Sequence, residues 1–116
     1  MRPVVEIDAV VQLPELSDAL WLALEQIAPF GMDNARPLFA VLGARLAGPP
    51  LVWKEKHLKV AVKQGTRTVT MKAWNMADRA AELTAMSAEG PMDIAFEMER
   101  GWYSEWELTA REFRAS

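Results

Sequence analysis

The stretch His57-Leu58-Lys59-Val60-Ala61-Val62-Lys63 decides the fold of this chain, because apolar and polar side chains alternate along it. A period of two is typical of a strand that buries one face. Gln64-Gly65-Thr66 then supplies a short turn, and residues 68–74 alternate again. Two alternating runs around a short loop that contains Gly predict a β-hairpin.

The segments on either side of this hairpin supply the rest of the fold. Residues 38–46 form an apolar run that ends at Gly48-Pro49-Pro50, which favours a strand over a helix. Apolar residues recur at intervals of three and four after Pro14, and residues 76–88 are rich in helix-forming Ala. We therefore expect an extended lead-in at 1–13, helices at 14–28 and 76–88, and strands at 38–46, 57–63, 68–74, 93–99 and 105–111.

This order of elements predicts a mainly β protein with helices. A five-stranded OB-fold β-barrel has its helix between strands three and four, as expected here, and an N-terminal helix precedes it. An SH3-like barrel would lack the helix at 76–88, and a ferredoxin-like fold would need a helix after its first strand. We expect residues 1–30 to form a lead-in segment and N-terminal helix that pack on the barrel, and residues 31–116 to form the OB-fold domain.

The composition fits a single soluble domain and excludes several classes of protein. The chain has 116 residues, of which 51% are hydrophobic, with no Cys and one His. These counts exclude a zinc ribbon, an iron–sulfur cluster, a disulfide scaffold, a thiol nucleophile and a multi-His metal site. The sequence has neither the roughly 18 consecutive apolar residues of a membrane span nor the regions of a signal peptide. We expect a cytoplasmic protein without a membrane partner.

Nothing in the sequence indicates catalysis by this chain alone. The acidic residues are spread over predicted strand exteriors and helix ends, and His57 has no Ser or Asp at a motif spacing. Phosphate-binding Gly-rich loops and Asp/His clusters with metal-ligand spacing are also missing from the sequence. We therefore expect no catalytic residue, no metal and no cofactor in this chain, which by itself is not an enzyme.

The charge is divided unevenly along the chain. The net charge is −3, which taken alone argues against a partner as acidic as nucleic acid. Residues 51–79, however, hold seven Lys and Arg against two acidic residues, a net +5, and the remainder has a net −8. The chain is therefore a basic hairpin in an acidic body.

Aromatic residues accompany these cations, and a single strand of nucleic acid needs both. The polar face of the hairpin, with the loops that join strands one to two and four to five, is where OB folds bind oligonucleotides. Trp21 and Trp106 are expected in the core. Strand-exterior Lys can equally serve solubility and edge protection, and the remaining Trp side chains could plug the barrel ends. The candidate nucleic-acid-binding residues are Lys54, Lys56, His57, Lys59, Lys63 and Lys72 with Trp53, Trp74, Trp102 and Tyr103.

The segment from Ala28 to Phe39, followed by Lys56-His57-Leu58-Lys59-Val60, resembles the OB-fold domain of the bacterial RecJ family. The family pattern is approximately P-F-G-x-x-N-x-x-P-x-F, followed some twenty residues later by a strand that begins with H-L-K. Ala73-Trp74-Asn75 lies where the family has a similar small-aromatic-polar triplet, and the resemblance covers nearly the whole chain. One departure is Ala35, where the family often has Pro. Near the end, residues 100–104 replace an Asn-aromatic-x-Gly turn, and residues 105–108 replace a last strand that contains Gln.

The resemblance implies that the parent protein is a 5′→3′ exonuclease specific for single-stranded DNA, a hydrolase of DNA repair and recombination. Its catalysis would reside in an Asp-His-His domain with Mn²⁺ or Mg²⁺, which this chain lacks. The implied partners are single-stranded DNA, the catalytic core domains and other repair proteins. A structural or protein-interaction role, bracing the core or docking a repair partner, is the alternative. Structural motif residues would be Pro29, Phe30, Gly31, Asn34 and Pro37.

Overall fold

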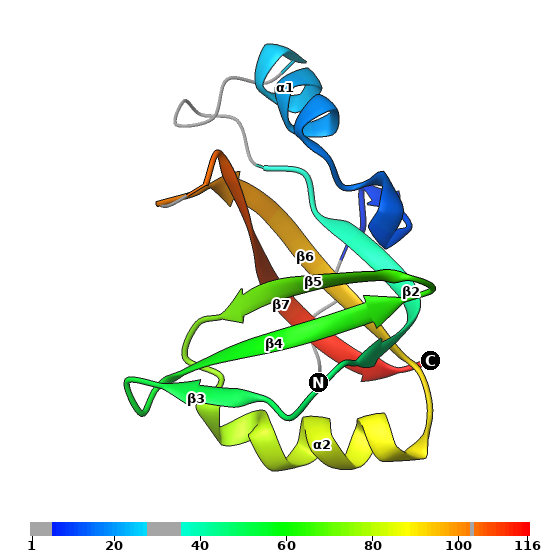
Figure 1. Cartoon of the computed structure of the whole chain (residues 1–116), viewed down its shortest axis with the longest axis vertical. Helices are drawn as coiled ribbons and strands as arrows, with labels where there is room; N and C mark the ends of the chain where they lie inside the picture. Colours follow the sequence, from blue (N-terminus) through cyan, green and yellow to red (C-terminus); the bar gives the residue numbers. More distant parts are fainter. Residues whose placement is uncertain (1–5, 28–35, 103) are drawn as a thin grey trace.

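A computed structural model describes residues 6–27, 36–102 and 104–116 of the chain, which form one bent β-sheet with two α-helices (Figure 1). The helix α2 lies across one end of the sheet, and α1 lies at the other end (Figure 1). Two 3-10 turns, η1 and η2, precede the helices. The elements are β1 (Ala9–Val10), η1 (Leu13–Glu15), α1 (Asp18–Ile27), β2 (Phe39–Leu46), β3 (Leu51–Trp53), β4 (His57–Gln64), β5 (Arg67–Ala73), η2 (Ala77–Arg79), α2 (Ala80–Glu89), β6 (Met92–Arg100) and β7 (Trp106–Ala115).

The strand order is β1-β2-β6-β7-β5-β4-β3, and β2 also pairs with β4 through Arg45↔Lys63 and Leu46↔Val62. Each strand in the series β2, β6, β7, β5 and β4 therefore pairs with the next, and the last, β4, pairs with the first, β2. This mainly β arrangement, with α2 between β5 and β6, is consistent with an OB-like fold. The expected number of five strands is wrong, because the sheet has seven. The two extra strands, β1 and β3, have two and three residues and are too short to show a period of two.

The hairpin at the centre of the chain is confirmed. It pairs β4 and β5 in continuous register from Leu58↔Ala73 to Gln64↔Arg67, around a turn in which Gly65 has a φ of 61°. Leu58, Val60, Val62, Met71 and Ala73 are fully buried, as the alternation predicts. The polar side chains between them therefore point away from the core.

The first helix begins later than Pro14. Leu13–Glu15 forms the 3-10 turn η1, and Leu16 has extended backbone (φ −75°, ψ 115°), so the α-helix starts only at Asp18. Ser17 Oγ accepts a hydrogen bond from the Leu20 amide at 3.2 Å and so caps the helix. The expected helix end at Pro29 and the domain boundary after residue 30 lie outside the described residues.

The N-terminal segment shares the core of the sheet. Leu13, Leu16 and Trp21 are buried in the same apolar cluster as the strands β4 to β7 and Leu83 of α2. Trp106 is only partly buried, and its Nε1 donates a hydrogen bond to Asp18 Oδ1 at 2.7 Å. The core position expected for Trp21 is therefore confirmed, whereas Trp106 lies at the edge of the core.

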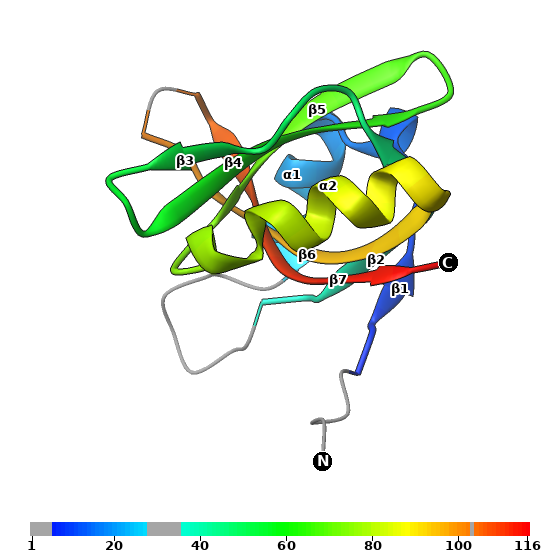
Figure 2. The same cartoon turned by 90° about the horizontal axis from the view of Figure 1, so that it is seen from below.

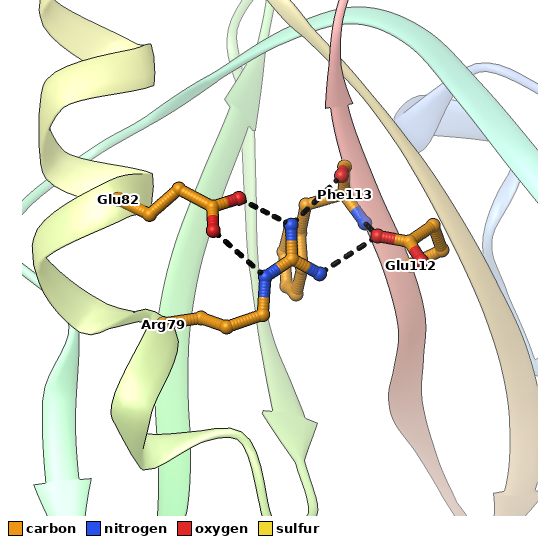
Figure 3. A network of polar contacts seen from close by, with 4 residues as sticks. All are labelled: Arg79, Glu82, Glu112 and Phe113. Atoms are coloured by element: carbon orange, nitrogen blue, oxygen red, sulfur yellow. Dashed lines mark hydrogen bonds and ion pairs between the residues drawn. The ribbon is translucent and has the colours of Figure 1, made fainter. Parts of the chain in front are cut away.

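Arg79 ties the start of α2 to β7 (Figure 3). Its guanidinium bonds the Glu82 carboxylate at 2.6 Å, Glu112 Oε1 at 2.7 Å and the Phe113 carbonyl oxygen at 3.1 Å. The hydrogen bond to Glu82 is the largest influence and, together with Glu112, outweighs partial burial and raises the pKa of Arg79 above its usual value. The guanidinium stays charged, so this network holds α2 against the sheet.

Candidate nucleic-acid interface

The outer face of β3, β4 and β5 gathers the candidate residues into one surface. The register places Trp53 opposite His57 and Lys59 opposite Lys72. Because side chains opposite each other on neighbouring strands lie on the same face, these four and Trp74, which follows β5, share the side turned away from the core. The sheet thus brings together residues up to 21 positions apart in the sequence.

Three rings form an aromatic cluster on this face. The ring centroid of Trp53 lies 5.0 Å from those of both His57 and Trp74, and the His57 and Trp74 rings meet edge to face at 4.8 Å. All three contacts are tilted or edge to face, the geometries that aromatic pairs prefer. Trp74 keeps 38% of its surface exposed. The cluster therefore leaves part of an aromatic surface open to solvent.

His57 is held in place within this cluster. Its Nδ1 accepts a hydrogen bond from the backbone amide of Asn75 at 2.9 Å. Asn75 has a φ of 58°, a left-handed conformation that Asn tolerates better than most residues. Asn75 thus turns the chain so that its own amide fixes the ring of His57.

Lysine side chains surround the aromatic cluster. Lys54 Nζ and Lys59 Nζ each lie 5.5 Å from the Trp53 ring centroid, and Lys72 Nζ lies 5.8 Å from both Trp53 and Trp74. These distances are within the roughly 6 Å range of cation–π attraction. Trp53 is therefore the common neighbour of three ammonium groups.

A tight turn brings Lys54 to this position. Lys54 and Glu55 have φ values of 52° and 61°, and the Lys56 amide donates to the Trp53 carbonyl oxygen at 3.2 Å. Positive φ at both central residues is typical of a type I′ turn, whose twist matches a hairpin. Neither residue is Gly, so the turn stores strain of about 1–2 kcal/mol per residue.

The cations of the basic region, residues 51–79, and those of the acidic remainder differ in their ion pairs. In the acidic remainder of the chain, Arg100 and Arg111 form ion pairs with Glu side chains, and Arg79 of the basic region pairs with Glu82 and Glu112 of that remainder. Lys72 pairs with Glu107 at 3.1 Å. By contrast, within residues 6–27, 36–102 and 104–116 no carboxylate lies within 4.0 Å of Lys54, Lys56, Lys59 or Lys63. These four lysines therefore keep positive charge that no described carboxylate neutralises by direct contact.

Trp102 lies apart from the aromatic cluster, on the loop between β6 and β7. It is 86% exposed, and among the described residues no ring contact joins it to another aromatic side chain. This loop and the β3–β4 turn lie at the same side of the molecule in both views (Figures 1 and 2). The Trp102 amide points to Glu107 Oε1 at 3.4 Å. The loop that carries this exposed indole thus lies at the same side of the molecule as the β3–β4 turn.

The remaining candidates are more scattered. Lys63 is exposed near the other end of β4, where it lies opposite Arg45 of β2. Lys56 is also exposed, and its carbonyl oxygen accepts from the Ala77 amide at 3.0 Å. Pro37 is partly buried just before β2. Pro29, Phe30, Gly31, Asn34 and Tyr103 lie outside the described residues.

Two residues of this surface were not among the site residues predicted from the sequence. Arg45 extends the basic face through its pairing with Lys63, and Glu107 neutralises Lys72. Arg45 and Glu107 each lie on a different strand from the lysine that they meet, and alternation within one strand does not predict which strands pair. The general alternation of β7 does predict that Glu107 faces outward.

The fold and this surface together define an OB-like β domain with a basic, aromatic face. A family model described as RecJ OB domain matches residues 7–108, so the chain belongs to the RecJ OB domain family. No curated protein sequence matches the chain at a significant level. None of the helices described is long and apolar enough to cross a membrane. The described part of the chain also contains no group of three or more His, Asp or Glu that could hold a metal ion.

Proposed function

We propose that this chain is the single-stranded-DNA-binding OB module of a RecJ-like 5′→3′ exonuclease that acts in cytoplasmic DNA repair and recombination. The module positions the strand for a nuclease core outside this chain, whose chemistry would depend on Mn²⁺ or Mg²⁺. The observation that carries the proposal is the cluster of Trp53, His57 and Trp74 beside Lys54 and Lys59, which have no carboxylate within 4.0 Å among the described residues. Family membership supports it.

The chemistry of the surface suits a single strand better than a duplex. Ammonium groups attract the phosphates of either, whereas exposed rings can stack only on unpaired bases. Because Trp53, His57 and Trp74 already contact one another at about 5 Å, no base can insert between them. Bases would stack on the open surface of Trp74 and on the separate, exposed Trp102.

Titration of the 116-residue chain with a labelled oligo-dT, at about 50 mM and about 200 mM salt, tests this proposal. Each phosphate contact contributes about 0.7 to the slope of log affinity against log salt for a single strand. Lys63→Ala should lower the affinity and make the slope shallower by that amount. Arg114→Ala removes an exposed cation of β7 and should leave the affinity and the salt slope unchanged. Absence of binding at the lower salt, or binding that does not depend on salt, would overturn the proposal.

A second candidate function, contact with the nuclease core or a repair partner, is favoured by a groove on other elements. This groove of ≈1000 Å³ is lined by β1, β2, β6, β7 and α2 with Arg79, and by no residue of β3, β4 or β5. Val10 and Leu42 line it and are 61% and 48% exposed. A Val10→Ser/Leu42→Ser variant should lose association with the core fragment and keep its affinity for oligo-dT. Unchanged association would exclude this role for the groove.

A further inference from the structure

A second groove, with polar and apolar side chains in its lining, separates β5 from β7 beside the basic face. The two strands run parallel and pair only through Met71↔Leu108 and Lys72↔Thr109 in the described part of the chain. Before Met71, β5 diverges from β7, and a groove of ≈350 Å³ opens between them. This volume is at the lower end of the range of small-ligand sites and suits one nucleotide unit.

The side chains of this groove have the chemistry of a nucleotide site. Arg67 and Lys72 provide cations, whereas Thr68, Thr70 and Ser104 provide hydroxyl groups. Arg67 Nη2 donates to the Leu16 carbonyl oxygen at 3.2 Å, which holds the guanidinium at the groove. Arg67 carries further N–H donors beyond that bond, and guanidinium donors match phosphate oxygens.

Trp106 forms an apolar wall of the groove. Its Nε1 is bonded to Asp18 at 2.7 Å, so the indole is anchored to α1 and presents its ring rather than its polar edge. A ring surface next to cations and hydroxyl groups is the combination that a sugar–phosphate unit with its base requires.

Glu107 occupies the end of this groove. Its carboxylate accepts a hydrogen bond from Lys72 Nζ at 3.1 Å and lies 3.4 Å from the Trp102 amide. The Lys72 and Glu107 side chains are only 19% and 22% exposed. A single carboxylate therefore links the lysine of β5 to the loop that carries the exposed Trp102.

We propose that the β5–β7 groove is a phosphate-binding nucleotide subsite, and that a phosphate of the bound strand replaces Glu107 at Lys72. This inference rests on the proposed function. Phosphate and carboxylate offer the same charge-assisted acceptor to an ammonium group, so Glu107 competes with the strand and sets its affinity. The exchange also releases the Trp102 amide from Glu107, which couples phosphate binding to the position of that loop.

The test is the salt dependence of oligo-dT binding by Glu107→Gln. The amide retains the shape of the side chain and removes the competing charge. The affinity should rise about 3–10-fold, and the slope of log affinity against log salt should steepen by about 0.7, because Lys72 becomes a full phosphate contact. In a Lys72→Met background the same substitution should no longer change the slope.

Glu97→Gln is the matched control. It removes one carboxylate from the outer face of β6, where Glu97 pairs with Arg111, and Arg111 retains Glu99. The control should leave the slope unchanged. If Glu97→Gln and Glu107→Gln change the slope equally, Glu107 acts only through the net charge of the chain, and the proposed exchange is wrong.

Thr70→Val tests the groove without touching the ion pair. It removes one hydroxyl at nearly constant shape and should lower the affinity about 2–5-fold, the equivalent of one hydrogen bond, at an unchanged slope. An unchanged affinity would overturn the subsite. If the unsubstituted chain binds oligo-dT and Glu107→Gln has the same slope, the exchange is wrong while the proposed function stands. If the unsubstituted chain does not bind, the proposed function itself fails.

Discussion

Lys59 of β4 lies directly opposite Lys72 of β5, and the two ammonium groups lie 5.5 Å and 5.8 Å from the same Trp53 ring centroid. Like charges that face each other across a sheet are destabilising. The Trp53 ring attracts both cations, and Glu107 neutralises one of them. The pair is therefore tolerated at a place where stability alone would favour an uncharged residue.

Lys59→Met should separate stability from binding. Removal of one member of the facing pair relieves repulsion, so the Tm should rise by about 1–3 °C. The affinity for oligo-dT should fall, and the salt slope should become shallower by about 0.7. Thermal unfolding and the salt titration measure the two effects. A fall in both Tm and affinity would indicate that Lys59 mainly supports the fold.

Trp102→Ala should weaken binding without affecting stability. The indole is 86% exposed and packs against no other ring among the described residues, so its removal should leave the Tm unchanged. Loss of one stacked base should lower the affinity by about 1–3 kcal/mol, with the salt slope preserved. An oligo-dT titration with thermal unfolding as the control measures this. Full affinity in the variant would exclude Trp102 from the interface.

Trp53→Leu should lower both the stability of the chain and its affinity for oligo-dT. Trp53 contacts His57, Trp74 and three lysines, so its loss removes support from the whole cluster. We expect the free energy of unfolding to fall by about 1–2 kcal/mol and the affinity to fall as well. Denaturant unfolding and oligo-dT titration check this expectation. A variant with normal stability and normal affinity would contradict the central role of Trp53.

Arg79→Ala should destabilise the chain and leave DNA binding intact. The substitution leaves Glu82 and Glu112 without their shared cation and frees the Phe113 carbonyl oxygen (Figure 3). The free energy of unfolding should fall by about 1–3 kcal/mol, measured by denaturant titration. Arg79→Lys should recover part of the loss, because an ammonium group cannot reproduce the planar fork. Equal stability of all three proteins would show that the network is dispensable.

Glu55→Gly should stabilise the chain. Glu55 has a φ of 61°, and Gly adopts this conformation without the steric cost borne by other residues. Relief of that strain should raise the free energy of unfolding by about 1 kcal/mol. Glu89→Gly, at the end of α2, is a control in which Gly should not stabilise. A destabilised Glu55→Gly variant would mean that chain entropy outweighs the strain of the turn.

Local patterns predicted the parts of the fold that depend on neighbours in the sequence. The alternation of residues 57–63 and 68–74 correctly identified a half-buried hairpin, and the Ala-rich segment after Met76 became η2 and α2. The uneven charge located the lysines in the hairpin region, and alternation placed Lys59 and Lys72 on its outer face. The start of the first helix was misplaced, because Leu16 adopts an extended backbone that apolar spacing does not reveal.

What the sequence by itself determined is therefore the hairpin, the side on which its lysines lie and membership of the RecJ OB domain family. Only the tertiary structure decided that Trp53, His57 and Trp74 form one cluster and that Glu107 meets Lys72. The physical reason is that strand pairing, unlike alternation, joins residues without a fixed separation. Glu107 reaches Lys72 across 35 positions, because β7 lies beside β5 in the sheet.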